Sequence, residues 1–240
     1  MGPLTWIKQT DRRIADDYAG TPLYFQLSPT RLSLTRVLFP RIETYIHGRC
    51  LDAGAGRSAY QPILIESADT YVSIDIHSKP GLDTVGSLLQ LPFPPACFDS
   101  IFCSQVLEHV PKPQQAIMEM ARCLKPGGIA IFTVPHLSYL HNEPHDYFRF
   151  TKHGLRHLMD SAGLDIIEIT PAGGLLSFLG HIASLIGKAL LYPIPVFGPL
   201  GVRLNAYYAR FVVMLDRRVD KQKLYALNYV AVGKKTETKS

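Results

Sequence analysis

The sequence predicts an α/β protein built on a doubly wound, mostly parallel sheet. Apolar, β-branched segments alternate with helical segments between residues 49 and 170, and this alternation favours parallel β-α-β units. A glycine-rich turn follows the first strand, and an aspartate ends the second. Together, these features are typical of sheets that bind a nucleoside-containing cofactor at the carboxyl ends of their strands.

The predicted elements follow one another with short connections up to residue 170. Residues 28–46 predict one or two helices, with Ser28 or Thr30 as cap and Pro40 as a break. Period-two and apolar runs predict strands at residues 49–51, 70–76, 98–106, 129–135, 164–170 and 224–232. Helices are expected before Ala68 and at residues 113–124, where residues 125–128 end the helix, and at residues 150–163.

These elements divide the chain into four parts. Residues 1–48 form an N-terminal helical cap, and residues 49–170 form the cofactor-binding core. Residues 171–220 form a helical apolar insertion, because some fifty residues are too many for a plain connection between strands. Residues 221–240 hold the last strand of the core and a disordered basic tail.

Composition excludes several classes of protein. Of the 240 residues, 47% are hydrophobic and 19% are charged, so the chain is not disordered. From Arg203 onward there are nine Lys/Arg against three Asp/Glu, whereas the preceding part has sixteen against seventeen. This localised charge argues against a nucleic-acid partner. Four cysteines without metal-ligand spacing and a beginning without an apolar signal core predict reduced, buried thiols and a cytoplasmic protein.

The glycine-rich turn is Leu51-Asp52-Ala53-Gly54-Ala55-Gly56. Its glycines let the backbone approach a ligand closely, and Asp75 stands where a carboxylate accepts both ribose hydroxyls. The alternatives are a tight turn without a ligand and a helix cap for Asp52. Gly54, Gly56 and Ala59 also fit a dinucleotide motif, but Asp52 would repel a pyrophosphate and suits a cofactor with a cationic group.

Five motifs carry a resemblance to a known family across residues 50–170: LDAGAG, VSIDI, LQLPFPPACFDSIFCSQVLEHV, RCLKPGG and IAIFTVP. In this order and spacing they resemble the class I S-adenosylmethionine-dependent methyltransferases of the type 11 or UbiE-like group. The resemblance implies a seven-stranded Rossmann-like sheet with an antiparallel last strand. It also implies S-adenosyl-L-methionine as the cofactor.

The resemblance further implies the residues that hold the cofactor. Asp75 would hold the ribose hydroxyls and Ile76 the adenine, while Ser104 and Gln105 would face the methionine end. The family often has a Gly-Asp pair near the adenine amino group, and this chain has Gly86-Ser87 instead. The expected cofactor-binding set is Asp52, Ala53, Gly54, Gly56, Asp75, Ile76, Ser87, Leu88, Ser104 and Gln105.

Candidates for the chemistry gather in residues 135–151, after the strand at residues 129–135. His145 is the first candidate for a general base, with Asp146 fixing its tautomer or the loop, and His109 is the second. His136, His141, Asp146, Tyr147 and Arg149 are expected to line the acceptor pocket. The alternatives are an Asp146–Arg149 ion pair and structural hydrogen bonds for both histidines. No metal is expected, because Pro144 argues against a helix that would pair His141 with His145.

The insertion leaves three interpretations open. Residues 175–191 are apolar on nearly all sides, residues 192–201 form a proline-broken link, and residues 203–218 predict an amphipathic helix. Residues 175–218 are a lid over the acceptor, a peripheral membrane contact with arginines on anionic lipid, or a homodimer contact. The sequence thus predicts a methyltransferase acting on a small or lipid-linked acceptor. The alternatives are a non-catalytic S-adenosylmethionine-binding protein and an NAD-dependent oxidoreductase.

Overall fold

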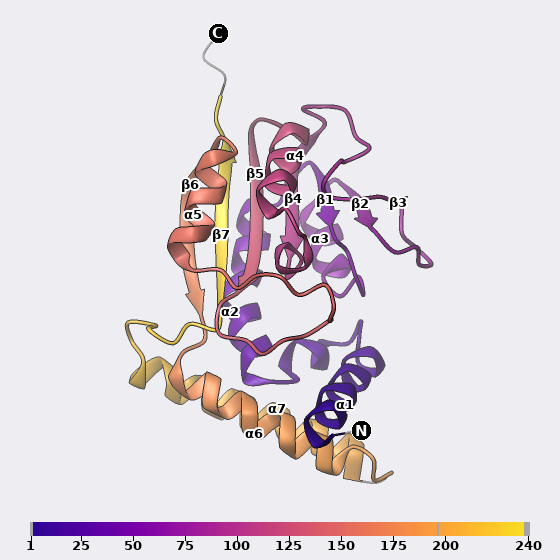
Figure 1. Ribbon diagram of the computed structural model, residues 1–240, viewed down its shortest axis with the longest axis vertical. Helices are drawn as coiled ribbons and strands as arrows, with labels where there is room; N and C mark the ends of the chain where they lie inside the picture. Colours follow the sequence, from indigo (N-terminus) through magenta and orange to yellow (C-terminus); the bar gives the residue numbers. More distant parts are fainter. Residues whose placement is uncertain (1, 196, 238–240) are drawn as a thin grey trace. The chain divides into compact units, whose positions relative to one another are not determined.

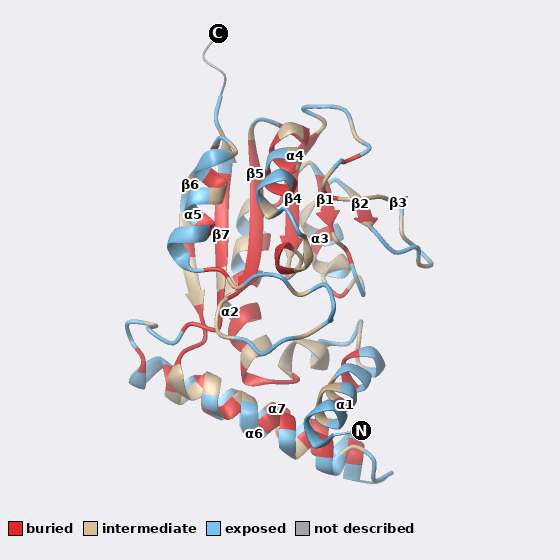
Figure 2. Cartoon of the chain, viewed as in Figure 1, coloured by how far each residue is buried: buried red, intermediate tan, exposed pale blue. Residues whose placement is uncertain are grey.

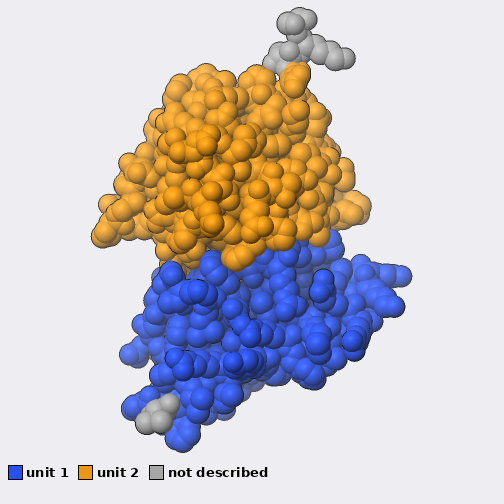
Figure 3. All heavy atoms as spheres, turned by 180° about the vertical axis from the view of Figure 1, so that it is seen from behind, with its two compact units in different colours: residues 1–37, 171–228 blue, residues 38–170, 229–240 orange. Residues whose placement is uncertain are grey.

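The computed structural model describes residues 2–195 and 197–237. These residues form two compact units, which are coloured separately in Figure 3. The sheet unit comprises residues 38–170 and 229–240, and the helical unit comprises residues 1–37 and 171–228. Residues 238–240 of the predicted basic tail lie outside the described part.

The sheet has seven strands in the order β3-β2-β1-β4-β5-β7-β6. β1 pairs in parallel with β2 and β4, β2 with β3, and β4 with β5. β7 runs against its neighbours, as the arrows in Figure 1 show. The predicted fold class, with its antiparallel last strand, is therefore confirmed. The strands are β1 (Arg49–Ala53), β2 (Thr70–Asp75), β3 (Thr84–Val85), β4 (Phe98–Ser104), β5 (Leu124–Pro135), β6 (Leu164–Ala172) and β7 (Asn228–Lys235).

Helices cover both faces of the sheet (Figure 1). α4 (Pro113–Cys123) and α5 (Lys152–Ser161) lie on one face, and α3 (Gln61–Ser67) lies on the other. α4 follows the predicted pattern, because its Ala116, Ile117 and Met120 are all fully buried. The predicted cap Thr151 accepts a hydrogen bond from the Gly154 N–H at 3.0 Å. The strands form the buried centre of the unit, which is red in Figure 2.

Several element boundaries differ from the predictions for physical reasons. α2 (Pro29–Tyr45) is one helix that continues through Pro40, and its Leu38 and Ile42 are fully buried, so packing overrides the break. Residues 125–128 belong to β5 and not to a separate helix stop. The last strand begins at Asn228, four residues later than predicted, because the Asp220 carboxylate accepts the N–H groups of Leu224 and Tyr225 and holds them in a turn.

The helical unit contains α1 (Pro3–Asp17), a 3₁₀ turn η1 (Pro22–Gln26), α6 (Leu175–Leu191) and α7 (Phe197–Val219). α6 has the predicted bounds, whereas α7 begins six residues before Arg203 and takes in half of the predicted link. α6 and α7 pack closely, since a Cβ on Gly180 would lie 2.7 Å from a Val212 methyl group. In the part of the chain that the structure describes, no helix combines the length and apolarity needed to cross a membrane.

Buried charged groups link the helices of this unit. Lys188 on α6 forms an ion pair with Asp11 on α1, and Asp216 on α7 accepts the Leu176 N–H and the Ser177 hydroxyl. The two ends of the insertion lie side by side where β6 ends and β7 begins. There the Leu227 N–H donates to the Ala172 carbonyl at 2.9 Å. The four cysteines are free thiols, as predicted, and only Cys97 is not buried.

Candidate functional site

The glycine-rich turn connects β1 to the segment before α3. The N–H groups of Gly54 and Ala55 donate to the Ile74 carbonyl at 2.8 and 3.0 Å, which joins the turn to the end of β2. Gly54 has φ +83°, and a Cβ there would lie 2.6 Å from a Val106 methyl group. Glycine is therefore required at position 54, both by its positive φ and by the contact with Val106.

Asp75 occupies the predicted position at the end of β2 and contacts the turn. One of its carboxylate oxygens accepts the Gly56 N–H at 2.8 Å, and the other accepts the His77 N–H at 3.0 Å. Ile76 beside it is 65% exposed. The structure thus brings Gly56, Asp75 and Ile76 together at the carboxyl ends of neighbouring strands, where such sheets bind ligands.

Asp52 lies at the end of β1 and is buried. Its carboxylate accepts the Tyr71 hydroxyl at 2.8 Å. Burial raises the pKa of Asp52 to about 7, although the Tyr71 hydrogen bond and the charge of Lys79 lower it. A buried carboxylate of this kind is stabilised by a cationic partner.

Sequence reasoning missed two residues at this turn, Tyr71 and Lys79. The Lys79 ammonium donates to the Gly56 carbonyl and to the Ser58 hydroxyl, the latter at 2.7 Å. Tyr71 is one of several aromatic residues in the chain, and Lys79 follows the strand by four residues, so no motif marks either of them.

The remaining cofactor candidates lie on both sides of the turn. The Ser104 hydroxyl is 2.8 Å from that of Thr133, to which the Gln105 amide also donates at 3.1 Å. Thr133 is a further residue that the sequence did not single out. The Ser87 hydroxyl accepts the Leu89 N–H at 3.2 Å, and Leu88 is buried. Ala53 is fully buried in β1 and contributes packing.

The loop between β5 and α5, residues 136–151, is held by Arg149. Its guanidinium makes two hydrogen bonds of 2.7 Å to the Asp146 carboxylate and also donates to the carbonyls of Ser138, Tyr139 and Phe148. Although burial acts in the opposite direction, Arg149 and the His141 N–H lower the pKa of Asp146 to about 2. Asp146 and Arg149 therefore form the ion pair that the sequence left as an alternative.

The two histidines considered as bases lie close together. The His109 Nδ1 is 2.6 Å from the carbonyl oxygen of His145, and the His145 Nδ1 is 2.9 Å from the Tyr147 hydroxyl. His145 and Tyr147 are exposed, whereas 19% of the His109 side chain is exposed. The side-chain partner of His145 is thus Tyr147 and not Asp146.

His141 and His136 have different surroundings. The His141 Nδ1 is 3.6 Å from the Asp146 carboxylate, and its Nε2 is 3.7 Å from Glu108. Burial acts to lower the pKa of His141, but Glu108, the Tyr139 carbonyl and Asp146 raise it above the ordinary value. His136 lies apart from this group, with its Nδ1 2.9 Å from the Phe150 carbonyl and its ring against Tyr229.

The fold is a Rossmann-like α/β sheet, and its glycine-rich turn and Asp75 meet at the carboxyl ends of neighbouring strands. Residues 51–132 match the family model described as "Methyltransferase domain". Residues 51–132 are therefore similar to the methyltransferase domains of the type 11 group, whose cofactor is S-adenosylmethionine.

Curated relatives and solved structures extend this comparison. A ubiquinone biosynthesis O-methyltransferase of Burkholderia thailandensis is 33% identical over 92 residues, which cover 31% of this chain and 40% of that protein. The chain thus spans less than half the length of this relative.

Solved structures share the fold at lower identity. The [4+2]-cyclase SpnF has a TM-score of 0.58 at 18% identity, with 85% of this chain and 81% of that chain covered. The 1,6-didemethyltoxoflavin-N1-methyltransferase of B. thailandensis, solved with its substrate and S-adenosylhomocysteine, has a TM-score of 0.55 at 15% identity, covering 99% and 92%. Since one of the two is named as a cyclase, the fold alone does not fix the reaction.

Proposed function

We propose that the protein transfers the methyl group of S-adenosylmethionine to a hydroxyl oxygen of a small or lipid-linked acceptor. The observation that carries the proposal is the buried Asp52 carboxylate at the glycine-rich turn. A carboxylate there favours the ammonium or sulfonium group of S-adenosylmethionine and disfavours a pyrophosphate. The acceptor type is drawn from relatives that are named as O-methyltransferases.

S-adenosylmethionine would supply the methyl group to an acceptor oxygen, and the electron pair of the carbon–sulfur bond would go to sulfur. Because a hydroxyl must also lose its proton, a base is required. We assign this role to His145, whose Nδ1 contacts the Tyr147 hydroxyl, so that Nε2 is the nitrogen that would take the proton. Arg149 and Asp146 hold the loop in place, and alignment supplies much of the remaining rate enhancement.

Calorimetry tests the cofactor, with S-adenosylhomocysteine and NAD as separate titrants. We expect S-adenosylhomocysteine to bind and the titration with NAD to give no measurable heat of binding. Tight binding of NAD alone would overturn the proposal in favour of an oxidoreductase.

Turnover is tested with S-adenosylmethionine carrying a labelled methyl group and a panel of phenols and isoprenoid-linked phenols, read out by mass spectrometry. His145→Ala should lower turnover about 100-fold or more at unchanged cofactor affinity. Cofactor binding with no labelled product from any phenol would support the non-catalytic alternative instead.

We also propose that α6 and α7 contact a membrane surface. Both helices carry an exposed apolar stripe at helical spacing: Leu179, Ile182, Ile186 and Leu190 on α6, and Phe197, Leu200, Leu204, Tyr207 and Phe211 on α7. Arg203, Arg210 and Arg217 recur every seven residues, so they flank the α7 stripe on one edge. Apolar stripes with basic edges are typical of helices that bind anionic lipid.

Vesicle flotation tests this contact. The protein should float with vesicles containing phosphatidylglycerol and should float less with pure phosphatidylcholine. Phe211→Glu should abolish flotation, whereas Met118→Glu, at a similarly exposed position on α4, should not. The membrane contact would be refuted if the wild-type protein did not bind vesicles. If light scattering then showed that the wild type self-associates and Phe211→Glu does not, the stripe would be a homodimer contact.

A further inference from the structure

Glu108 is a fully buried carboxylate whose oxygens have no hydrogen-bond partner among the described residues. It lies in the short 3₁₀ turn η2 (Leu107–His109) that follows β4. Its backbone carbonyl accepts the N–H groups of Tyr147 and Phe148, which fastens the loop over it. Because burial of an unpartnered carboxylate is costly, this position calls for a positively charged partner.

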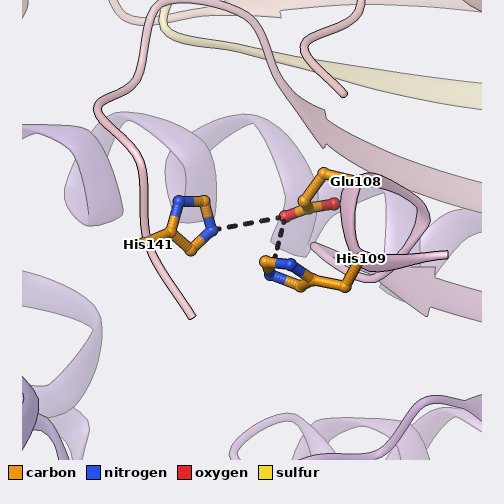
Figure 4. Close-up of side chains that lie close together, drawn as sticks. All are labelled: Glu108, His109 and His141. Atoms are coloured by element: carbon orange, nitrogen blue, oxygen red, sulfur yellow. Dashed lines mark ion pairs between the residues drawn. The ribbon is translucent and has the colours of Figure 1, made fainter. Parts of the chain in front are cut away.

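Two imidazoles are directed at this carboxylate, as Figure 4 shows. The Nε2 atoms of His109 and His141 lie 3.8 and 3.7 Å from the same Glu108 oxygen, and the three ligand atoms are within 4.8 Å of one another. The two rings stand almost at right angles, with their centroids 4.9 Å apart. None of these separations is a hydrogen bond.

Both imidazoles are oriented from behind by backbone carbonyls. The His109 Nδ1 faces the His145 carbonyl at 2.6 Å, and the His141 Nδ1 faces the Tyr139 carbonyl at 3.2 Å. A ring that donates its Nδ1–H in this way presents the lone pair of its Nε2 to the front. Carbonyl or carboxylate partners on the rear nitrogen are the usual surroundings of metal-binding histidines.

We propose that Glu108, His109 and His141 bind one divalent transition-metal ion, with zinc as the best match. Two imidazoles and a carboxylate are a common zinc ligand set that leaves a fourth position for water or a ligand. With bonds of about 2.0–2.2 Å, tetrahedral ligand atoms lie about 3.3–3.6 Å apart, so the observed distances to Glu108 need only a small contraction. Asp146, within 4.0 Å of both Nδ1 atoms, adds negative charge behind the rings.

Two other contacts define the competing arrangement, in which protons take the place of the metal. The Asn142 amide lies 3.4 Å from the His109 Nε2, and the Arg149 guanidinium lies 3.3 Å from the His141 Nδ1. If Arg149 donated there, the His141 Nε2 would carry the proton and direct it at Glu108. A metal and a proton on Nε2 exclude each other, so a direct measurement of metal binding separates the two arrangements.

The experiment uses the full chain without a tag, stripped of metal by a chelator and titrated with ZnCl₂ in a calorimeter. One equivalent of zinc should bind, and Co²⁺ should give visible absorption bands that zinc abolishes. Loss of a residue that only orients a metal ligand lowers metal affinity about 10- to 100-fold. Glu108→Gln and His141→Gln each remove a direct ligand, so each should lower zinc affinity about 100-fold or more. Circular dichroism verifies the fold of each variant.

His145→Gln is the matched control, because it removes a histidine from the same loop but not from the three ligands. It should leave zinc affinity within about threefold of wild type. A wild-type chain without a stoichiometric zinc site would overturn the proposal, as would a folded His141→Gln variant of unchanged affinity. The readout does not depend on methyl transfer, and a metal on His109 leaves His145 as the base.

Discussion

The glycine-rich turn and the loop of residues 136–151 are held in place by different means. In the turn, backbone N–H groups and a positive φ fix the path, and Val106 leaves no space for a side chain at Gly54. In the loop, the guanidinium of Arg149 gathers three carbonyls and a carboxylate. The turn is therefore fixed mainly by its backbone, whereas the loop also depends on the side chain of Arg149.

Substitutions in the turn should have the largest effect. Gly54→Ala should lower the free energy of unfolding by about 4 kcal/mol, the sum of left-handed strain and of overpacking against Val106. Gly56→Ala should cost only about 1 kcal/mol, because its Cβ would meet nothing closer than 3.8 Å. Urea unfolding of both variants measures the difference.

A double variant sharpens this test. Val106→Ala removes the methyl groups that lie 2.6 and 2.8 Å from the added Cβ, so it should recover part of the loss in Gly54→Ala. Equal costs at Gly54 and Gly56, or no recovery in the double variant, would mean that Val106 does not restrict the turn.

In the loop, Arg149→Met should cost about 2–3 kcal/mol, because it leaves the Asp146 carboxylate without its main partner. Arg149→Lys should recover only part of this, since an ammonium does not reproduce the fork that binds several oxygens at once. Hydrogen exchange should rise in residues 138–147 and stay unchanged in the turn. Faster exchange in both regions would contradict the separation of the two mechanisms.

The fold and the turn could be predicted because each depends on neighbouring residues. Asp52 to Gly56 are consecutive, and the register Ala53↔Ile74 of β1 and β2 places Asp75 beside them. The group of Glu108, His109 and His141 could not be predicted in the same way. His141 follows His109 only after α4 and β5, and the group depends on the Tyr147 N–H reaching the Glu108 carbonyl.

The helical insertion shows the same distinction. The bounds of α6 follow from the apolar sequence of the helix itself. The early start of α7 depends instead on a hydrogen bond from the Gly198 N–H to the Ile194 carbonyl in the proline-rich link. Local pattern alone predicts a break there, because Pro and Gly disfavour helices.

The charge of Asp52 should have a moderate effect, seen as a pH dependence of cofactor affinity. With its pKa near 7, Asp52 loses its proton as the pH rises and only then attracts the amino group of the cofactor. Affinity for S-adenosylhomocysteine should therefore tighten about tenfold between pH 6 and pH 8. Asp52→Asn should bind weakly and equally at both pH values, and a variant that kept the pH dependence would assign it to another group.

The smallest effect is expected at Ser87. Ser87→Asp introduces the acid that related domains often carry near the adenine amino group, and one added hydrogen bond is worth about 2- to 10-fold in affinity. Calorimetry with S-adenosylhomocysteine and with S-inosylhomocysteine, which lacks that amino group, checks the assignment. Equal gains for both ligands would place Ser87 away from the adenine.

The single hydrogen bond between Leu227 and Ala172 has a consequence for how this protein changes over time. Because the chain departs and returns at the same point, α6 and α7 form a cassette whose length is independent of the strands. Such an attachment tolerates changes in the length of the segment without a shift of strand register, provided that the new segment still covers α1, whose Asp11 pairs with Lys188. The cassette is therefore the segment that evolution or an engineer can vary while the seven strands keep their order.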